Sequence, residues 1–340
     1  MVDRYIHSIY KDAIQDYDGY ESYCYQNCQR IILEHRYGAE ALMMINTALS
    51  VEETTENEIK IKEKKEMRSL LPSLDKYAHR LYYNLKENEE KIFKDNIKFI
   101  FEENQPIIVG VDTFYLPHSN NYKKKHAKHT MILCGYDLEK SVVYIIDWYK
   151  PWAFKGEMSI ENFLEARNSM NADDGSFYSG TPIGNNWAYI EPIEQYDIDK
   201  LFAETIVISK NNYFNFNHTG IINTLLSVQK YIDSLEEENV YERIFFEIYT
   251  LINRKKIFLE YIELYSKLKS QNYYHDFIDI LKKNISCWDV FTVLLLKQSK
   301  RYNGKTRIRI VKKMSELIEE EKNMIEKFQK TFERIGVNHE

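Results

Sequence analysis

Apolar residues recur three and four positions apart in two separate parts of the chain. In the first part, the stretches 22–48 and 81–103 show this spacing, which predicts helices, and Gly38 interrupts the earlier one. In the second part, from about residue 199 onward, helical spacing continues with almost no strand signal. Helices are expected over residues 220–236, 241–270, 274–285, 288–302 and 305–335. The second part of the sequence therefore predicts an all-helical domain.

Between these helical parts the hydrophobic pattern changes to short, β-branched runs. Residues 106–112, 129–136 and 141–148 form three such runs, each too short for a helix, so we expect buried strands. Residues 137–140, between the last two runs, predict a hairpin loop, and residues 187–192 are a further strand candidate. Helices followed by an antiparallel meander are typical of an α+β domain rather than of alternating βαβ units.

The change of pattern divides the chain near residue 197. Residues 1–197 are expected to form the α+β domain, and residues 198–340 the helical domain. Within the first domain, residues 52–67 are almost all charged, with Glu and Lys at helical spacing. This stretch predicts either a solvated helix or a mobile loop.

Composition and charge argue against several classes of protein. The 340 residues include 46 Lys and Arg against 52 Asp and Glu, a net charge of −6, whereas a dedicated nucleic-acid-binding domain is normally basic. Nowhere do apolar residues approach the roughly 20 that span a bilayer, and charged residues stand near the N-terminus where a signal peptide would need an apolar run. We therefore expect a cytoplasmic protein that binds neither nucleic acid nor membrane. Its four cysteines, in a reducing compartment, do not form a disulfide framework.

Cys24 stands where a helix is expected to begin. It follows the turn signal Asp18-Gly19 and precedes the helical run 26–35. At a helix start the unpaired backbone N–H groups and the helix dipole favour negative charge, which lowers the pKa of a thiol. Cys28 lies one turn further along the same helix; it suits a core position better, and it is the alternative nucleophile. The remaining cysteines are expected in the core: Cys134 and Cys287.

A thiolate nucleophile needs a base, and the base needs a group that orients it. His129 opens one strand of the expected hairpin and Asp147 closes the next, so both lie at the same end of the sheet. There Asp147 could accept a hydrogen bond from one ring nitrogen of His129 while the other nitrogen faces Cys24. This is the Cys-His-Asp arrangement of papain-like enzymes.

Two segments around these residues resemble the peptidases that remove bacteriocin leader peptides. They are Cys24-Tyr-Gln-Asn-Cys28, continued by aliphatic residues to Gly38, and His129-Thr-Met-Ile-Leu-Cys-Gly135-Tyr-Asp137. The sequence is more similar to the family named after butirosin biosynthesis protein H. That resemblance is carried by Val109-Gly-Val-Asp112, Leu116-Pro117, His126-x-x-His129 and Gly135-Tyr-Asp137, and more weakly by Gly220-Ile-Ile and the Trp288 helix.

The resemblance implies a papain-like fold and a transferase rather than a protease. By it, Cys24 would accept an acyl or peptidyl group from the phosphopantetheine thioester of a carrier protein, and His129 would deprotonate a small amine acceptor. The product is an amide, and no cofactor is bound. Such proteins act in nonribosomal, thiotemplated natural-product biosynthesis, including antibiotic pathways, and this chain is similar to amide-forming enzymes of polythioamide (closthioamide-type) pathways.

One position departs from the leader-peptidase pattern. Those enzymes carry a Gln six residues before the catalytic Cys, where its side chain stabilises the oxyanion, and here that position is Asp18. Loss of one such donor typically costs roughly 2.7–4 kcal/mol of barrier. A thioester is more activated than a peptide, so the loss is more tolerable for acyl transfer. Gln15 or the amides at the helix start could substitute.

Three other interpretations of the site stay open at this stage. The first is a cysteine peptidase or amidase that hydrolyses a peptide. The second is a non-catalytic module that binds a carrier protein. The third is a zinc site, because the spacings of Cys24 with Cys28 and of His126 with His129 each offer paired ligands. Without zinc, His126 is a loop residue or a substrate contact.

Further features suggest partners without identifying them. The basic run 123–129 is either a solvated loop or a surface that attracts an acidic carrier protein or its phosphopantetheine phosphate. Trp148 and Trp152 either cover the His129–Asp147 pair or belong to the core. The helical domain could serve as a homodimer surface, a lid or a docking platform, and its sequence does not distinguish among these.

Overall fold

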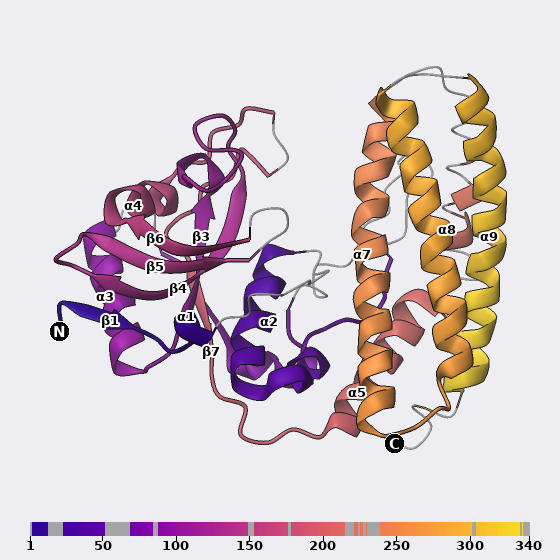
Figure 1. Ribbon diagram of the computed structural model, residues 1–340, viewed down its shortest axis with the longest axis horizontal. Helices are drawn as coiled ribbons and strands as arrows, with labels where there is room; N and C mark the ends of the chain where they lie inside the picture. The colour runs from indigo at the N-terminus through magenta and orange to yellow at the C-terminus, as the bar shows by residue number, and fades with distance from the viewer. Residues whose placement is uncertain are drawn as a thin grey trace. The chain divides into compact units, whose positions relative to one another are not determined.

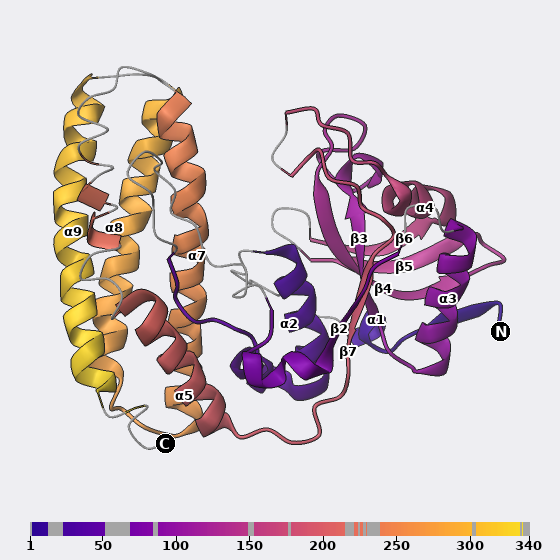
Figure 2. The same cartoon turned by 180° about the vertical axis from the view of Figure 1, so that it is seen from behind.

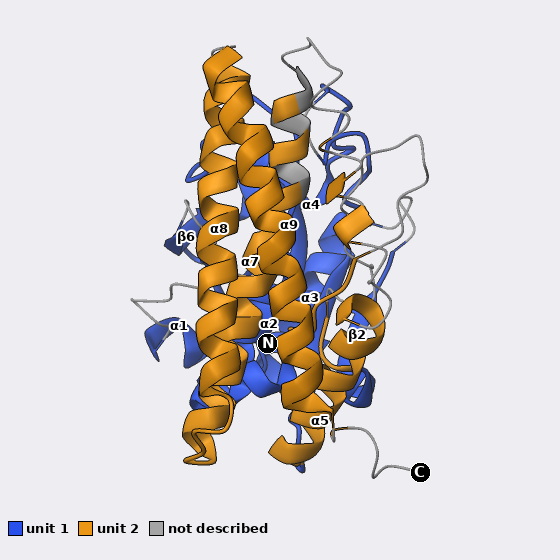
Figure 3. Cartoon of the chain, turned by 90° about the vertical axis from the view of Figure 1, so that its right-hand side faces the viewer, with its two compact units in different colours: residues 1–19, 23–45, 72–195 blue, residues 20–22, 46–71, 196–340 orange. Residues whose placement is uncertain are grey.

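The computed structural model describes residues 2–12, 23–51, 69–83, 88–148, 153–175, 178–214, 221–223, 225–226, 229, 239–300, 304–333 and 335. The chain divides into two compact units (Figure 3). Unit 1 consists of residues 1–19, 23–45 and 72–195, and unit 2 of residues 20–22, 46–71 and 196–340. A mixed fold is thereby confirmed, with an antiparallel sheet in unit 1 and helices in the C-terminal region.

The division differs from a single cut near residue 197. The segment 46–71 groups with the helical unit, although the sequence pattern places it in the α+β domain. Its backbone is paired there: Leu49 N donates to Ser209 Oγ at 3.0 Å. Val51 N donates to the carbonyl of Asn212 at 3.2 Å. Local periodicity does not record such long-range contacts.

Unit 1 is built on an antiparallel sheet (Figures 1 and 2). The strand order is β2 (Ala78–Leu81), β7 (Trp187–Ile190), β3 (Ile107–Asp112), β4 (Lys128–Asp137), β5 (Val142–Asp147) and β6 (Phe154–Ser159), and β1 (Arg4–Ile6) also pairs with β4. The three strands predicted from apolar runs and the candidate at 187–192 are all present. The strands β1, β2 and β6 carry no continuous apolar run and were not predicted.

Helices and short 3₁₀ turns surround this sheet. The helices of unit 1 are α1 (Ile9–Asp12), α2 (Cys24–Tyr37), α3 (Glu89–Glu102) and α4 (Ile160–Asn168), and the 3₁₀ turns are Gly38–Met44, Pro72–Tyr77 and Thr113–Tyr115. The predicted helix 81–103 was too long at its start, because Asn88 caps α3 by accepting hydrogen bonds from Glu90 N and Lys91 N at 2.8 and 3.2 Å. Leu81 belongs to β2 instead.

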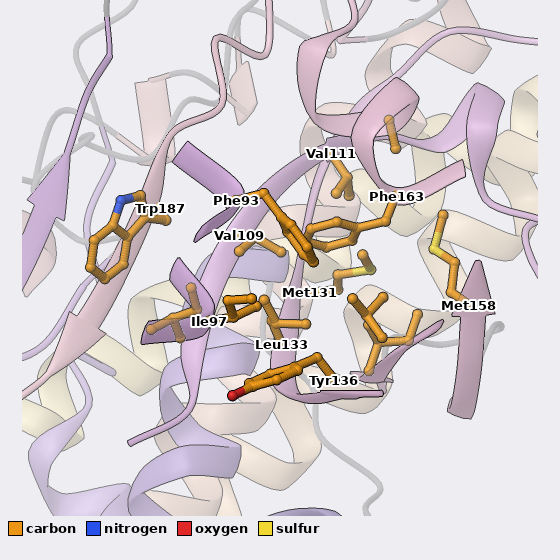
Figure 4. Close-up of a cluster of buried hydrophobic side chains, with 14 of the residues drawn as sticks. Phe93, Ile97, Val109, Val111, Met131, Leu133, Tyr136, Met158, Phe163 and Trp187 are labelled. Carbon is orange, nitrogen blue, oxygen red and sulfur yellow. The ribbon is translucent and has the colours of Figure 1, made fainter. Parts of the chain in front are cut away.

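The core of unit 1 lies between the sheet and the helices α3 and α4 (Figure 4). Phe93 of α3 and Phe163 of α4 meet edge to face with ring centroids 6.0 Å apart. Alternate residues of β3 and β4, which point to one face of the sheet, complete the cluster: Ile107, Val109, Val111, Met131 and Leu133. Val143 and Ile145 of β5 belong to the same cluster, so this packing also fixes β4 and β5, the two strands whose ends carry the site.

Unit 2 is mainly helical in the residues that the structure describes. Its elements are α5 (Ile198–Ser209), the π-helical turn Lys210–Phe214, α7 (Asn239–Leu268), α8 (His275–Lys300) and α9 (Gly304–Phe332). The predicted break between residues 285 and 288 was wrong, because the polar residues there do not interrupt α8. Residues 52–67 lie outside the described residues, and so does most of the predicted helix 220–236, of which only 221–223, 225–226 and 229 are described.

A fully buried carboxylate joins four elements of unit 2. Glu321 Oε1 accepts hydrogen bonds from Lys255 Nζ, Trp288 Nε1 and Asn284 Nδ2, the last at 3.0 Å. Its Oε2 accepts one from the Tyr213 hydroxyl at 2.8 Å. Burying a charge is costly unless it is paired and hydrogen-bonded, and here both conditions are met.

Among the helices that the structure describes, none combines the length and the apolar composition needed to span a membrane.

Candidate active site

The helix α2 places Cys24 at its first residue. The preceding residue, Tyr23, is extended with φ −128° and ψ 131°, so the chain turns into the helix directly before the thiol. The helix ends at Gly38, whose φ of +61° lies in the left-handed region that glycine adopts readily. Cys24 is partly exposed, whereas Cys28 is buried. Of the two residues, Cys24 is therefore the one that reaches the surface.

The hairpin of β4 and β5 brings His129 and Asp147 together. Ile132 pairs with Ile146 in the register of the two strands. Continuing that register places Asp147 and His129 as diagonal neighbours on one face. His129 Nε2 lies 2.7 Å from Asp147 Oδ1, and the two residues are only 4 % and 2 % exposed. A buried imidazole thus lies against a buried carboxylate at one end of the sheet.

His129 also contacts Cys24, so the structure brings all three predicted site residues together. Its side chain hydrogen-bonds the thiol. Since Nε2 is engaged by Asp147, the nitrogen that faces Cys24 is Nδ1. Thr130, the next residue of β4, contributes two more hydrogen bonds to the same sulfur, one from its hydroxyl and one from its backbone. The sulfur therefore lies at the meeting point of α2 and the first residues of β4.

These contacts favour the charged form of all three groups. Burial alone would raise the pKa of Cys24, but the attraction of His129 and the hydrogen bonds from His129 and Thr130 lower it overall. Burial alone would lower the pKa of His129, but Asp147 and Cys24 raise it well above its ordinary value. The pKa of Asp147 is lowered against burial by His129 and His118. The site therefore favours a thiolate–imidazolium pair held by a carboxylate.

Cys28 has the opposite electrostatic environment. Its Sγ donates to the carbonyl of Thr130 at 3.6 Å, and its side chain is enclosed by the protein. Burial raises its pKa well above the ordinary value, and the nearby negative charges of Cys24 and Asp147 raise it further. A buried, protonated thiol is a poor nucleophile. The geometry therefore favours Cys24 over Cys28 in that role.

A second histidine, His118, contacts Asp147 and was missed by the sequence analysis. Its Nε2 lies 2.8 Å from Asp147 Oδ2, and its ring stacks on Phe154 with centroids 4.1 Å apart and an interplanar angle of 5°. The only signal in the sequence was its position directly after Leu116-Pro117. No spacing rule links residues 29 apart in different elements, so the contact required a structure.

His126 belongs to a separate pair and does not join a zinc site. Its Nδ1 lies 2.7 Å from Asp112 Oδ2, and its ring stacks on Phe114 with centroids 4.3 Å apart. Asp112 is fully buried and also accepts a hydrogen bond from Ser169 at 2.6 Å. Among the described residues, no group of three or more His, Cys, Asp or Glu side chains is placed to hold a metal ion. The paired ligand spacings therefore do not converge on one site.

Other contacts fasten α2 beside the hairpin. Asn27, which is 4 % exposed, donates from Nδ2 to the carbonyl of Trp148, the residue after Asp147. This bond links α2 to the strand end that carries Asp147. Asp18, Gln15 and Trp152, to which the sequence analysis also gave possible roles, lie outside the described residues.

A comparison with known protein families matches the part of the chain that carries His118, His129 and Asp147. Residues 69–148 match the family model described as butirosin biosynthesis protein H, N-terminal. This butirosin biosynthesis protein H match runs from before β2 to the residue after Asp147, and it includes His118 and His129. It does not reach Cys24 or the helix α2. No curated protein matches the chain.

Proposed function

We propose that this protein is a cysteine-dependent acyltransferase that forms an amide from a carrier-bound thioester in natural-product biosynthesis. The observation that supports it is the contact of the Cys24 thiol with an imidazole whose other nitrogen is bound to a buried carboxylate. The similarity to a family named for antibiotic biosynthesis favours a biosynthetic rather than a digestive role.

The first half of the reaction transfers the acyl group to the enzyme. The Cys24 thiolate attacks the carbonyl carbon of the thioester, a new C–S bond forms, and the carbonyl oxygen takes up negative charge. When the intermediate collapses, the bond to the phosphopantetheine sulfur breaks. The leaving thiolate takes the proton from the His129 imidazolium. One thioester has then replaced another, so no ATP is consumed.

The second half passes the acyl group to an amine. His129, now neutral, accepts a proton from the amine nitrogen as that nitrogen attacks the acyl-enzyme carbonyl. The C–N bond forms, the bond to Cys24 breaks, and the thiolate is restored beside the imidazolium. Asp147 keeps the ring of His129 oriented with Nδ1 toward the sulfur throughout both halves.

The arrangement of elements supports a papain-like fold for unit 1. A helix that begins at the cysteine packs beside an antiparallel sheet whose successive strands carry the histidine and the aspartate. The histidine faces the sulfur through Nδ1 and the carboxylate through Nε2, which assigns the two nitrogens distinct tasks. In this proposal the amides of the first turn of α2 donate to the oxyanion, because helix N-termini carry N–H groups without intrahelical acceptors.

The connection between β3 and β4 is the proposed docking surface for the carrier. Lys123, Lys124 and Lys125 are exposed there, and so is Lys128, the first residue of β4, which directly precedes His129. An acidic carrier protein, or the phosphate of its phosphopantetheine arm, would be attracted to these ammonium groups. Because Lys128 is next to His129 in β4, an arm bound at these lysines would lie near the sulfur of Cys24.

The proposal is tested by trapping the acyl-enzyme. The purified protein is incubated with acetyl, octanoyl and benzoyl thioesters of N-acetylcysteamine and with an acylated carrier protein, and its mass is measured. We expect one added acyl group, absent in Cys24→Ala and retained in the matched variant Cys28→Ala. Hydroxylamine, a small amine nucleophile, is expected to release the group as a hydroxamate.

Three results would overturn this assignment in different ways. Release of free acid at equal rates with and without an amine would favour a hydrolase. Cleavage of a peptide with no acyl donor would favour a peptidase. Binding of the carrier protein without any adduct would favour a non-catalytic module.

A further inference from the structure

The carboxylate of Asp147 is shared by two imidazoles. His129 Nε2 lies 2.7 Å from Oδ1, and His118 Nε2 lies 2.8 Å from Oδ2. Asp147 is 2 % exposed, so protein groups rather than bulk water must satisfy most of its lone pairs. Both oxygens therefore have a ring N–H as partner, although papain-like chemistry requires only one.

His118 is held in place from outside the β4–β5 hairpin. It belongs to the connection between β3 and β4, and its ring lies flat on Phe154 at 4.1 Å. Phe154 is the first residue of β6 and is the strand partner of Asp147 itself. The side chain of His118 is 8 % exposed. Stacking on one side and the carboxylate at its edge together fix the direction in which Nε2 points.

We propose that His118 is a positioning residue of this site, an inference that rests on the function proposed above. By donating to Oδ2 it stops the carboxylate from rotating about its Cβ–Cγ bond, a torsion that is otherwise broad. Oδ1 then stays directed at His129, and the imidazole of His129 stays directed at Cys24. His118 acts on the sulfur only through these two residues.

Removing the second donor has a defined physical consequence. A buried carboxylate with one unpaired oxygen loses the stabilisation of its charged form, since hydrogen bonds to the charged form are what offset burial. Asp147 would then both turn and hold less negative charge beside His129. The imidazolium, and with it the thiolate of Cys24, would be less favoured.

Two substitutions separate hydrogen bonding from packing. His118→Gln keeps an N–H donor close to the position of the ring Nε2. His118→Phe keeps an aromatic ring on Phe154 but has no donor. The titration of the Cys24 thiolate is followed by its ultraviolet absorbance and by the rate of alkylation with iodoacetamide, in a Cys28→Ala background.

We expect His118→Phe to move the thiolate titration to higher pH and to slow alkylation near neutral pH at least tenfold. His118→Gln is expected to stay within about threefold of the parent. His126→Phe is the matched control, because His126 is also stacked on a phenylalanine and paired with a buried aspartate, but with Asp112. Its thiolate titration is expected to be unchanged.

The inference fails if His118→Phe titrates like the parent. It also fails if His118→Gln is impaired as much as His118→Phe while both unfold at the parent urea concentration, since the donor would then be irrelevant. These measurements need no acyl donor. If thiolate titration responds as expected but no variant ever forms an acyl adduct, His118 keeps its positioning role and the proposed transferase function is the part that is wrong.

Discussion

At the scale of single residues, Cys24 and Cys28 lie one helical turn apart but have different electrostatic environments. Cys24 receives hydrogen bonds from His129 and Thr130, whereas Cys28 lies deeper and beside negative charge. The difference arises from position alone, since both side chains belong to the same helix. A cysteine at the first residue of a helix can be reached from solvent and from the neighbouring sheet, and one a turn later is enclosed.

This difference predicts the pH dependence of thiol reactivity. The pKa of Cys24 is lowered, so its thiolate persists below the ordinary thiol pKa of about 8.5 and is lost only as pH falls through the lowered value. The pKa values of Cys28 and Cys134 are raised, so both stay protonated in the same range. At pH 6.5 we expect iodoacetamide to modify Cys24 at least ten times faster than any other cysteine, as peptide mass mapping would show.

The control for that experiment is urea-unfolded protein, in which all cysteines approach one ordinary pKa. Selectivity for Cys24 is expected to disappear there. Equal modification of Cys24 and Cys28 in the folded protein would contradict the electrostatic difference between them.

The sequence made part of the site visible at this scale. Cys24, His129 and Asp147 each stand at the end of an element, and element ends can be located from hydrophobic runs and turn residues. His118 and Thr130 could not be found in that way. His118 reaches Asp147 from a connection without periodicity, and Thr130 looks like any β-branched strand residue until Cys24 is placed beside it.

At the scale of elements, predictability followed the strength of the hydrophobic signal. The strands β3, β4 and β5 are continuous apolar runs buried along most of their length, and their predicted ends agree with the structure within one residue. The strand β6 reads Phe-Lys-Gly-Glu-Met-Ser and is mostly half-buried, and α4 follows it directly. Short, partly exposed elements of this kind carry too few apolar residues to reveal their period.

One glycine shows how tightly the first strand is packed. A Cβ built on Gly135 would lie 2.2 Å from the carbonyl oxygen of Tyr5 and 2.9 Å from the Cα of Ile6, both backbone atoms of β1. Gly135→Ala is therefore expected to push β1 away from β4 and to lower the free energy of unfolding by about 1–3 kcal/mol. Urea denaturation followed by circular dichroism measures this loss.

Gly304→Ala serves as the comparison for that substitution. A Cβ at Gly304 would meet no atom within 4 Å, and the residue begins the helix α9. It is expected to be neutral or slightly stabilising, since alanine restricts the unfolded chain more than glycine does. If the two variants unfold at the same urea concentration, β1 is not packed as described.

At the scale of the whole molecule, the chain enters and leaves each unit more than once. Residues 46–51 belong to the helical unit and are buried there, although the site residues lie on both sides of them in sequence. Arg254 donates to the carbonyl of Asn46 at 2.6 Å, in addition to the bonds that Leu49 and Val51 make with residues beyond 200. The hydrophobic pattern of the sequence shows neither that residues 46–51 belong to the helical unit nor which residues they contact there.

A fragment that ends at residue 197 is therefore expected to be unstable. It would keep the segment 46–51 but lose Ser209, Asn212 and Arg254, and each buried polar group left unpaired costs roughly 1–3 kcal/mol. We expect the fragment to aggregate or to lack a cooperative urea transition, and the full chain to show one. A soluble fragment that unfolds cooperatively and keeps selective modification of Cys24 would contradict this.

The buried carboxylate of Glu321 has a consequence for how the helical unit assembles. Its four donors come from three elements, α7, α8 and the π-helical turn Lys210–Phe214, and they meet the carboxylate of α9 only when α7, α8 and α9 are at one axial alignment. Sliding one helix by a single turn, about 5.4 Å, would separate an ammonium from a carboxylate in an apolar interior. Purely aliphatic bundles tolerate such a slip at little cost. In this unit the loss of the pairing between Lys255 and Glu321 would itself disfavour a misaligned bundle, whatever the packing of its aliphatic side chains.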